Sequence, residues 1–152
     1  MEQARMKVYL DDLRAGHAYI ELLPAGSDDG DVYGFYPAKF DEKKEVLLGE
    51  GQLRKDRTRL EKNRAAADVR QIAKTIPLSG EEFERLKQFL AKQEQNPSFY
   101  FLVGYNCIDF LEDAYAAAKE QPEDKLMDRY SDDELDELGY VGTYAKWRFI
   151  GG

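Results

Sequence analysis

The chain has 152 residues and a mass of 17.5 kDa, which fits one compact domain and argues against two. Hydrophobic residues make up 43% of the chain, enough for a core that needs neither disulfides nor a metal. The net charge of −8 argues against binding nucleic acid through a broad basic surface.

The cysteine and histidine content narrows the class of protein further. A single cysteine excludes an internal disulfide, and a single histidine excludes a zinc site of the usual kind. The sequence has no membrane-spanning apolar stretch and no signal-peptide core, so we expect no integral membrane association. We expect synthesis in the cytoplasm, from which export would need a specialised secretion system.

The first part of the chain predicts a β-hairpin. Residues 6–10 and 16–23 are rich in branched and aromatic residues, and 32–36 have the same character. The segment 24–31 between the last two is a turn cluster of Pro, Gly, Ser and Asp. Pro37 ends the returning strand.

The middle of the chain has a less regular pattern. Residues 41–68 carry many charges and few apolar anchors, so we predict a mobile excursion with some helix, in which 46–49 is a short strand or turn. Residues 68–78 predict another strand. A basic run within the excursion is typical of a solvated helix face, with a substrate- or partner-binding loop as the alternative. It consists of Arg54, Lys55, Arg57, Arg59, Lys62 and Arg64.

Two helices are predicted around a further strand. Ser79 and Glu82 form a capping-box pattern, and the helix that they open should end near 96–97. The aromatic stretch 98–103 predicts a strand, and apolar residues at helical spacing predict a helix from Cys107.

The last segment is acidic from 121 to 137 and aromatic over 139–150. So many apolar rings favour docking on the body of the protein. We therefore predict a single domain spanning the whole chain, with its core at about 6–118 and a docked C-terminal segment at 120–152.

Cys107 is the first candidate for chemistry. A lone cysteine in such a protein is most often a buried structural thiol. Here Asn106 is a good N-cap, so Cys107 falls at the first position of the predicted helix. Free backbone N–H groups at that position favour the thiolate and can hold an oxyanion.

His17 is the only general base of the ordinary kind that the chain offers near neutral pH. By itself it fits a strand residue with a satisfied imidazole. Together with Cys107 it supplies the two side chains that a Cys–His hydrolase requires. Their pairing is a prediction about the fold, because the two residues are far apart in the sequence.

The segments around these residues resemble those of a known superfamily. Residues 16–22, followed by a turn and 33–37, look like the histidine hairpin of circularly permuted papain-like proteins. Residues 105–111 are similar to their Asn-Cys-x-x-Phe-aliphatic nucleophile helix. This branch includes lecithin:retinol acyltransferase-like proteins, permuted NlpC-type peptidases, PPPDE-type peptidases and several bacterial effector or toxin domains. As in that branch, His17 precedes Cys107.

The resemblance implies an α+β fold in which a small antiparallel sheet packs against the nucleophile helix. It implies that Cys107 attacks a carbonyl while His17 acts as base and then acid, with no metal or organic cofactor. An amidase or peptidase acting on a peptide or peptidoglycan-type substrate ranks first, and a thioesterase or acyltransferase second. A secreted bacterial effector is the favoured setting, with an immunity or inhibitor protein as partner.

The third residue that usually orients the histidine is absent from the expected position. The returning strand offers Tyr33 and Tyr36, which we rank ahead of Asp31 and then Glu21. Glu21 is about 13 Å from His17 along an extended strand.

Asn106 and Tyr105 are candidates for lining the cleft beside the nucleophile. Two readings without catalysis stay open. One is a catalytically silent binding module on the same fold, and the other is an α+β adaptor in which Cys107 and His17 never meet.

Overall fold

A computed structural model describes most of the chain. The described residues are 3–11, 18–37, 48–55, 57–66, 68, 70–95, 99–101, 107–121 and 123–139. For residues 35–37, 48–54, 59, 63, 99–101 and 107 the description covers the backbone alone.

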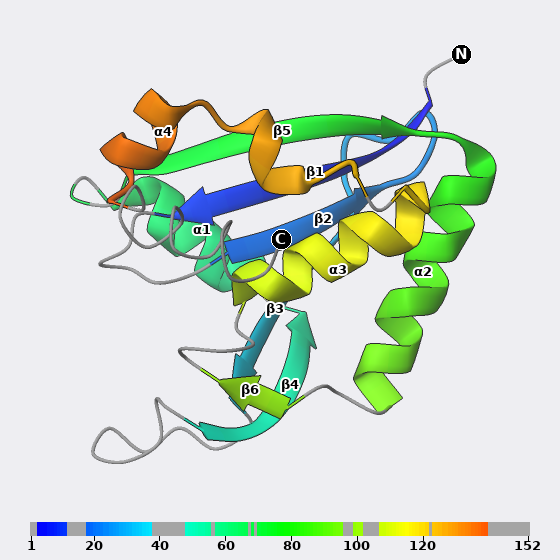
Figure 1. Ribbon diagram of the computed structural model, residues 1–152, viewed down its shortest axis with the longest axis horizontal. Helices are drawn as coiled ribbons and strands as arrows, with labels where there is room; N and C mark the ends of the chain where they lie inside the picture. The colour runs from blue at the N-terminus through cyan, green and yellow to red at the C-terminus, as the bar shows by residue number, and fades with distance from the viewer. Residues whose placement is uncertain are drawn as a thin grey trace.

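The described residues form an α+β fold with a six-stranded sheet in the order β5-β1-β2-β3-β4-β6 (Figure 1). All neighbouring strands are antiparallel. The strands are β1 (Ala4–Asp11), β2 (Ala18–Leu23), β3 (Asp31–Pro37), β4 (Leu48–Lys55), β5 (Gln71–Leu78) and β6 (Phe99–Phe101). The helices are α1 (Arg57–Ala65), α2 (Gly80–Gln95), α3 (Cys107–Lys119), the 3₁₀ helix η1 (Leu126–Arg129) and α4 (Asp132–Glu137). The predicted fold class is therefore confirmed.

The predicted hairpin is present as β2 and β3. Its turn contains Gly26 at φ +76°, a backbone conformation that glycine adopts without steric cost. Gly30 lies so close to the backbone of Leu22 that a Cβ atom would overlap the Leu22 carbonyl oxygen. The turn thus depends on two glycines for two different reasons.

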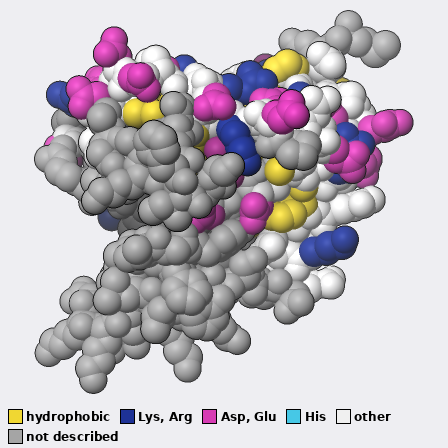
Figure 2. Space-filling model, viewed as in Figure 1, with side chains coloured by type: hydrophobic (Ala, Val, Ile, Leu, Met, Phe, Trp, Pro, Cys, Tyr) yellow, Lys and Arg dark blue, Asp and Glu magenta, His cyan; other side chains and the backbone are white. Residues whose placement is uncertain are grey.

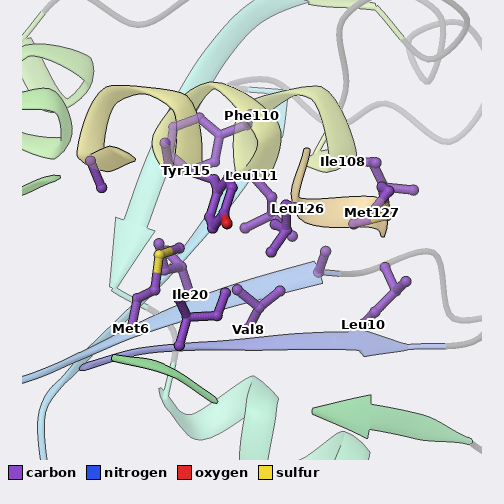
Figure 3. Packing of buried hydrophobic residues seen from close by; sticks show 14 of the residues in the cluster. Met6, Val8, Leu10, Ile20, Ile108, Phe110, Leu111, Tyr115, Leu126 and Met127 are labelled. Carbon is purple, nitrogen blue, oxygen red and sulfur yellow. The ribbon is translucent and has the colours of Figure 1, made fainter. Parts of the chain in front are cut away.

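Each face of the central strands packs against different helices. Even-numbered residues of β1 and β2 belong to the main core, which also takes in the apolar side chains of α2 and α3 (Figure 3). They are Met6, Val8, Leu10, Ala18, Ile20 and Leu22. On the other face Tyr9, Tyr19 and Val32 pack with Leu60 of α1. Every residue of β2 is therefore buried.

The described part of the C-terminal segment belongs to the main core. Its buried residues are Leu126, Met127, Tyr130, Leu135 and Leu138. The side chain of Lys74 on β5 donates to both carboxylate oxygens of Glu134, at 2.9 and 2.8 Å. The described part of this segment therefore packs on the main core, while residues 140–152, with most of the aromatic stretch that was expected to dock, lie outside the described residues.

Within the excursion predicted over 41–68, the described residues 48–55 and 57–66 are almost entirely regular secondary structure, while 41–47, 56 and 67 lie outside the description. The predicted helix content is present as α1, but Leu48–Lys55 forms β4, which pairs with both β3 and β6. The alternation of apolar residues in this strand is weak because Gly49 and Gly51 interrupt it. Its pairing partners are distant in sequence, so local composition did not reveal the strand.

The close packing at Gly30 generates a prediction for stability. Gly30→Ala should lower the free energy of unfolding by about 3 kcal/mol, because the new methyl group forces backbone against backbone. Urea unfolding at pH 7 measures the change. Gly80→Ala is the matched control, since a Cβ there has open space and the position is the first of α2. Equal stabilities of the two variants would contradict the packing described here.

The Lys74–Glu134 ion pair makes stability depend on pH. Bonds from Lys74 and the Ser131 backbone lower the pKa of Glu134 below its usual 4.5. Its stabilising effect is therefore complete above about pH 4.5 and is lost as the pH falls through the folded-state pKa. Glu134→Gln, which keeps the capping box, should cost about 1 kcal/mol at pH 7 and a smaller amount at pH 3. Urea titrations at both pH values test this, with Asp133→Asn as an exposed control.

Candidate functional site

The helix that carries the candidate nucleophile begins where the sequence predicts. Cys107 is the first residue of α3, and Ile108, Phe110 and Leu111 are buried in the main core. These apolar residues fix the helix against the sheet. The backbone N–H groups of its first turn have no partner within the helix, so this end carries positive electrostatic potential. The Cys107 side chain lies outside the description.

The start of α3 lies over one particular end of the sheet. In Figure 3, Ile108 lies toward the Leu10 end of β1, while Tyr115 lies toward Met6. Leu10 pairs with Ala18, the first residue of β2, and α3 contacts β2. Figure 1 shows the same arrangement, with α3 and β2 beginning side by side. Ala18, the residue that follows His17, and Cys107 therefore lie at the same end of the described structure.

Three of the predicted site residues lie outside the described part of the chain. They are His17, Tyr105 and Asn106. The roles expected for these residues, and the pairing of His17 with Cys107, stay predictions.

A partly buried carboxylate on α3 positions the segment beside its first turn. Glu112 accepts hydrogen bonds from the backbone N–H groups of Leu126 and Met127, at 2.6 and 3.2 Å. Burial raises the pKa of Glu112, and the two backbone bonds oppose this rise. Met127 lies next to Ile108 in Figure 3, so η1 packs beside the start of α3.

Glu21, one of the candidate third residues, faces away from α3. It accepts a hydrogen bond from the Tyr9 hydroxyl at 2.7 Å and forms an ion pair with Arg57 of α1 at 2.6 Å. The same guanidinium donates to the Gly30 carbonyl. Burial, together with the Glu21 carboxylate, raises the pKa of the Tyr9 hydroxyl. These contacts give Glu21 a structural role that joins α1 to the hairpin.

Two candidates on β3 are also placed by the register. Asp31 pairs with Leu22 at the far end of the hairpin, is exposed, and lies 3.7 Å from Lys55. Tyr33 pairs with Ile20 and packs against the main core; burial, and then the charges of Asp31 and Glu94, raise its pKa. Tyr33 is about 10 Å along the strand from Tyr36, three residues away. Of these candidates on β3, Tyr36 is the nearest to the end of the strand that lies beside Ala18 of β2. Its side chain lies outside the description.

Asp11 is a residue of this region that the sequence analysis did not single out. It ends β1, is fully buried, and accepts a hydrogen bond from Gln71 at 2.5 Å. The available signal was an acidic residue directly after the apolar run 6–10, at the end of the strand that pairs with β2.

The charged surface is uneven. Acidic side chains gather over α4 in Figure 2, where Asp132, Asp133 and Asp136 are exposed. Within the described ranges, three or more His, Cys, Asp or Glu side chains never come together in a group that could hold a metal ion. In the same part of the chain, each helix is too short or too polar to cross a membrane.

Comparison with known proteins gives no match: not with a family model, not with a curated protein and not with a solved structure.

Replacing Glu21 tests whether its role is structural. Glu21→Gln should lower the free energy of unfolding by about 2 kcal/mol, because it removes a buried carboxylate that accepts hydrogen bonds from both Tyr9 and Arg57. The pH dependence of Cys107 alkylation should stay that of the wild type. Glu61→Gln is the control, since this exposed carboxylate lies 3.9 Å from the same guanidinium and should cost under about 0.5 kcal/mol. A shifted alkylation profile in Glu21→Gln would instead return Glu21 to the candidate third residues.

Proposed function

We propose that this protein is a cysteine hydrolase in which Cys107 and His17 cleave an amide bond through an acyl-enzyme. One observation carries the proposal. Cys107 is the first residue of α3, and that end of α3 lies over the Leu10–Ala18 end of the sheet, where β2 begins. Two segments far apart in the sequence thus begin at the same end of the described fold. The resemblance to permuted papain-like proteins supports the same pairing.

The start of α3 supplies the electrostatics that the first step needs. The N–H groups and the positive dipole end at a helix start favour a thiolate at Cys107. The same groups stabilise the negative oxygen that forms when sulfur attacks a carbonyl carbon. The buried residues of α3 hold these donors rigidly against the sheet, so they need no reorganisation during the reaction.

The proposed reaction proceeds in two halves. The Cys107 sulfur, having given its proton to His17, forms a bond to the carbonyl carbon, and the resulting oxyanion collapses as the C–N bond breaks. The leaving amine takes the proton from the His17 imidazolium. Water then gives a proton to His17 and attacks the thioester, which releases a carboxylic acid and returns the proton to sulfur.

The substrate class follows from the same resemblance. A peptide or peptidoglycan-type amide ranks first, and a thioester or acyl-transfer substrate of the same fold second. We propose a bacterial effector, delivered by a specialised secretion system and matched by an immunity or inhibitor protein. The exposed acidic side chains of α4 favour a basic contact surface on such a partner.

A catalytically silent binding module is the second candidate, and the placement of two candidate third residues favours it. Glu21 is bonded to Tyr9 and Arg57, and Asp31 lies at the opposite end of β3 from Pro37, so neither is available beside the start of α3. Thiol reactivity separates the two candidates.

The pH dependence of Cys107 alkylation by iodoacetamide tests the proposal. In the wild type we expect the thiol to titrate between about pH 5 and 7, because the imidazolium and the helix start stabilise the thiolate. In His17→Ala the titration should return toward about pH 8.5. Since the chain has one cysteine, intact mass reports the reaction directly.

Two controls make the result interpretable. Thermal unfolding of His17→Ala shows that the variant is folded, and alkylation in urea gives the intrinsic reactivity of the thiol. A thiol that is inert in the folded protein, or that titrates identically with and without His17, would sink the catalytic proposal and favour the binding module. With a coupled pair established, hydrolysis of peptidoglycan peptides by the wild type and by Cys107→Ala comes next.

A further inference from the structure

Two cationic side chains converge on one aromatic ring at the face of the sheet that α1 covers. The Lys7 ammonium nitrogen lies 5.1 Å from the centre of the Tyr9 ring, and the Arg64 guanidinium carbon lies 6.0 Å from it. Lys7 and Tyr9 are neighbours on this face of β1, whereas Arg64 belongs to the last turn of α1. Among the contacts that join described residues, no other ring has two cations over it.

The two cations at Tyr9 also differ from the others in their counter-ions. In three of the other cation–ring pairs, the cation forms an ion pair with a carboxylate as well. These pairs are Lys55 on Tyr33, Lys74 on Tyr130 and Lys87 on Phe83. The fourth cation, Arg129, donates hydrogen bonds to the hydroxyl of its own ring. Neither Lys7 nor Arg64 forms an ion pair with a carboxylate of the described ranges.

The buried acids on this face of the sheet bond elsewhere. Glu21 lies opposite Lys7 in the register of β1 and β2, but its two oxygens are bonded to Tyr9 and Arg57. Asp11, at the end of β1, accepts a hydrogen bond from a side-chain amide of β5. The positive charges of Lys7 and Arg64 therefore add up beside one ring, which favours an anion between them.

The neighbouring edge strand leaves room for a ligand beside these cations. In the register of β1 and β5, Thr75 lies opposite Lys7, and Ala73 lies opposite Tyr9. Thr75, Ala73 and Arg64 are all exposed. Side chains directly opposite in an antiparallel pair have Cβ atoms about 4.5–5.5 Å apart. The Thr75 hydroxyl is therefore within reach of a group that Lys7 holds.

We propose that Lys7 and Arg64 bind a phosphate monoester over the Tyr9 ring, with the Thr75 hydroxyl as a further donor. Such a group carries a charge of about −1.5 to −2 at neutral pH, which two cations match. Lysine supplies a point charge for phosphate oxygens, and arginine supplies a fork of N–H donors. The site is independent of the proposed hydrolase, because it lies on the face of the sheet away from α3.

A phosphate group at this site would also tie the end of α1 to β1. In the described part of α1, the buried apolar residue is Leu60, and Arg57 in the first turn forms the ion pair with Glu21. The last turn contributes Arg64, which contacts the Tyr9 ring. A helix of nine residues is marginal without tertiary contacts. The ligand should therefore slow hydrogen exchange in the last turn of α1.

Amide NMR of the full chain tests the site, with glycerol 3-phosphate as the probe at pH 7.5 and ionic strength held constant with sodium chloride. We expect saturable shifts at Lys7, Tyr9 and Arg64, together with slower exchange at the end of α1. Lys7→Gln and Arg64→Gln should each weaken binding about fivefold, the loss of one exposed charge contact. Sodium acetate should give smaller shifts, because a single negative charge does not match two cations.

Two variants serve as matched controls. Lys87→Gln removes a cation that also lies over a ring but is paired with Glu84. Lys62→Gln makes the same change of charge on α1, two residues from Arg64 and thus on another side of the helix. Both variants should bind the probe as the wild type does.

The possible results decide the proposal. A wild type without saturable shifts overturns it, as does equal weakening in Lys62→Gln, which would reveal a general effect of net charge. Equal binding of acetate overturns the assignment to phosphate. A phosphoserine peptide then separates two sources of the same chemistry. Tighter binding of the peptide, with the same dependence on Lys7 and Arg64, assigns the site to a phosphorylated protein. Binding no tighter than that of glycerol 3-phosphate assigns it to a small phosphate ester.

Discussion

Burial of β2 on both faces is the constraint on which the rest of the described structure depends. Its even-numbered side chains join the core under α3, and its odd-numbered side chains meet β1, β3 and α1. A strand in this position cannot slip by one residue, because a slip would exchange the two sets of side chains. The register of β1, β2 and β3 follows, and with it the end of the sheet at which α3 begins.

The one acidic residue within β2 shows how this burial is reconciled with charge. Glu21 faces α1, where the Tyr9 hydroxyl and the Arg57 guanidinium satisfy it. Arg57 also bonds to Gly30 and to Asp29, so a single side chain joins the helix to the hairpin turn. With Leu60 as the buried apolar residue of the described part of α1, this ion pair determines where the helix sits. The basic run of the sequence thus has at least one member with a structural role.

The opposite face carries the proposed nucleophilic site. The start of α3, the adjacent 3₁₀ segment bonded to Glu112 and the Leu10–Ala18 end of the sheet lie together. The proposed chemistry uses the helix start for the anion and the strand end for the base.

The sequence by itself determined the elements whose signals are local. The hairpin turn, the capping box at Ser79, the strand at 68–78 and the helix start at Cys107 were predicted, because periodicity, caps and glycine positions depend on neighbours in the chain. Of β4 only the start was anticipated, as the short strand or turn at 46–49, because the strand is stabilised by pairing with β3 and β6. For the same reason only the tertiary structure shows that Glu21 pairs with Arg57 and that Asp31 lies at the end of the hairpin away from Ala18. It also shows that the end of β1 at Asp11 lies beside the start of β2. Register and packing set these relations, and both arise from contacts between residues far apart in the sequence.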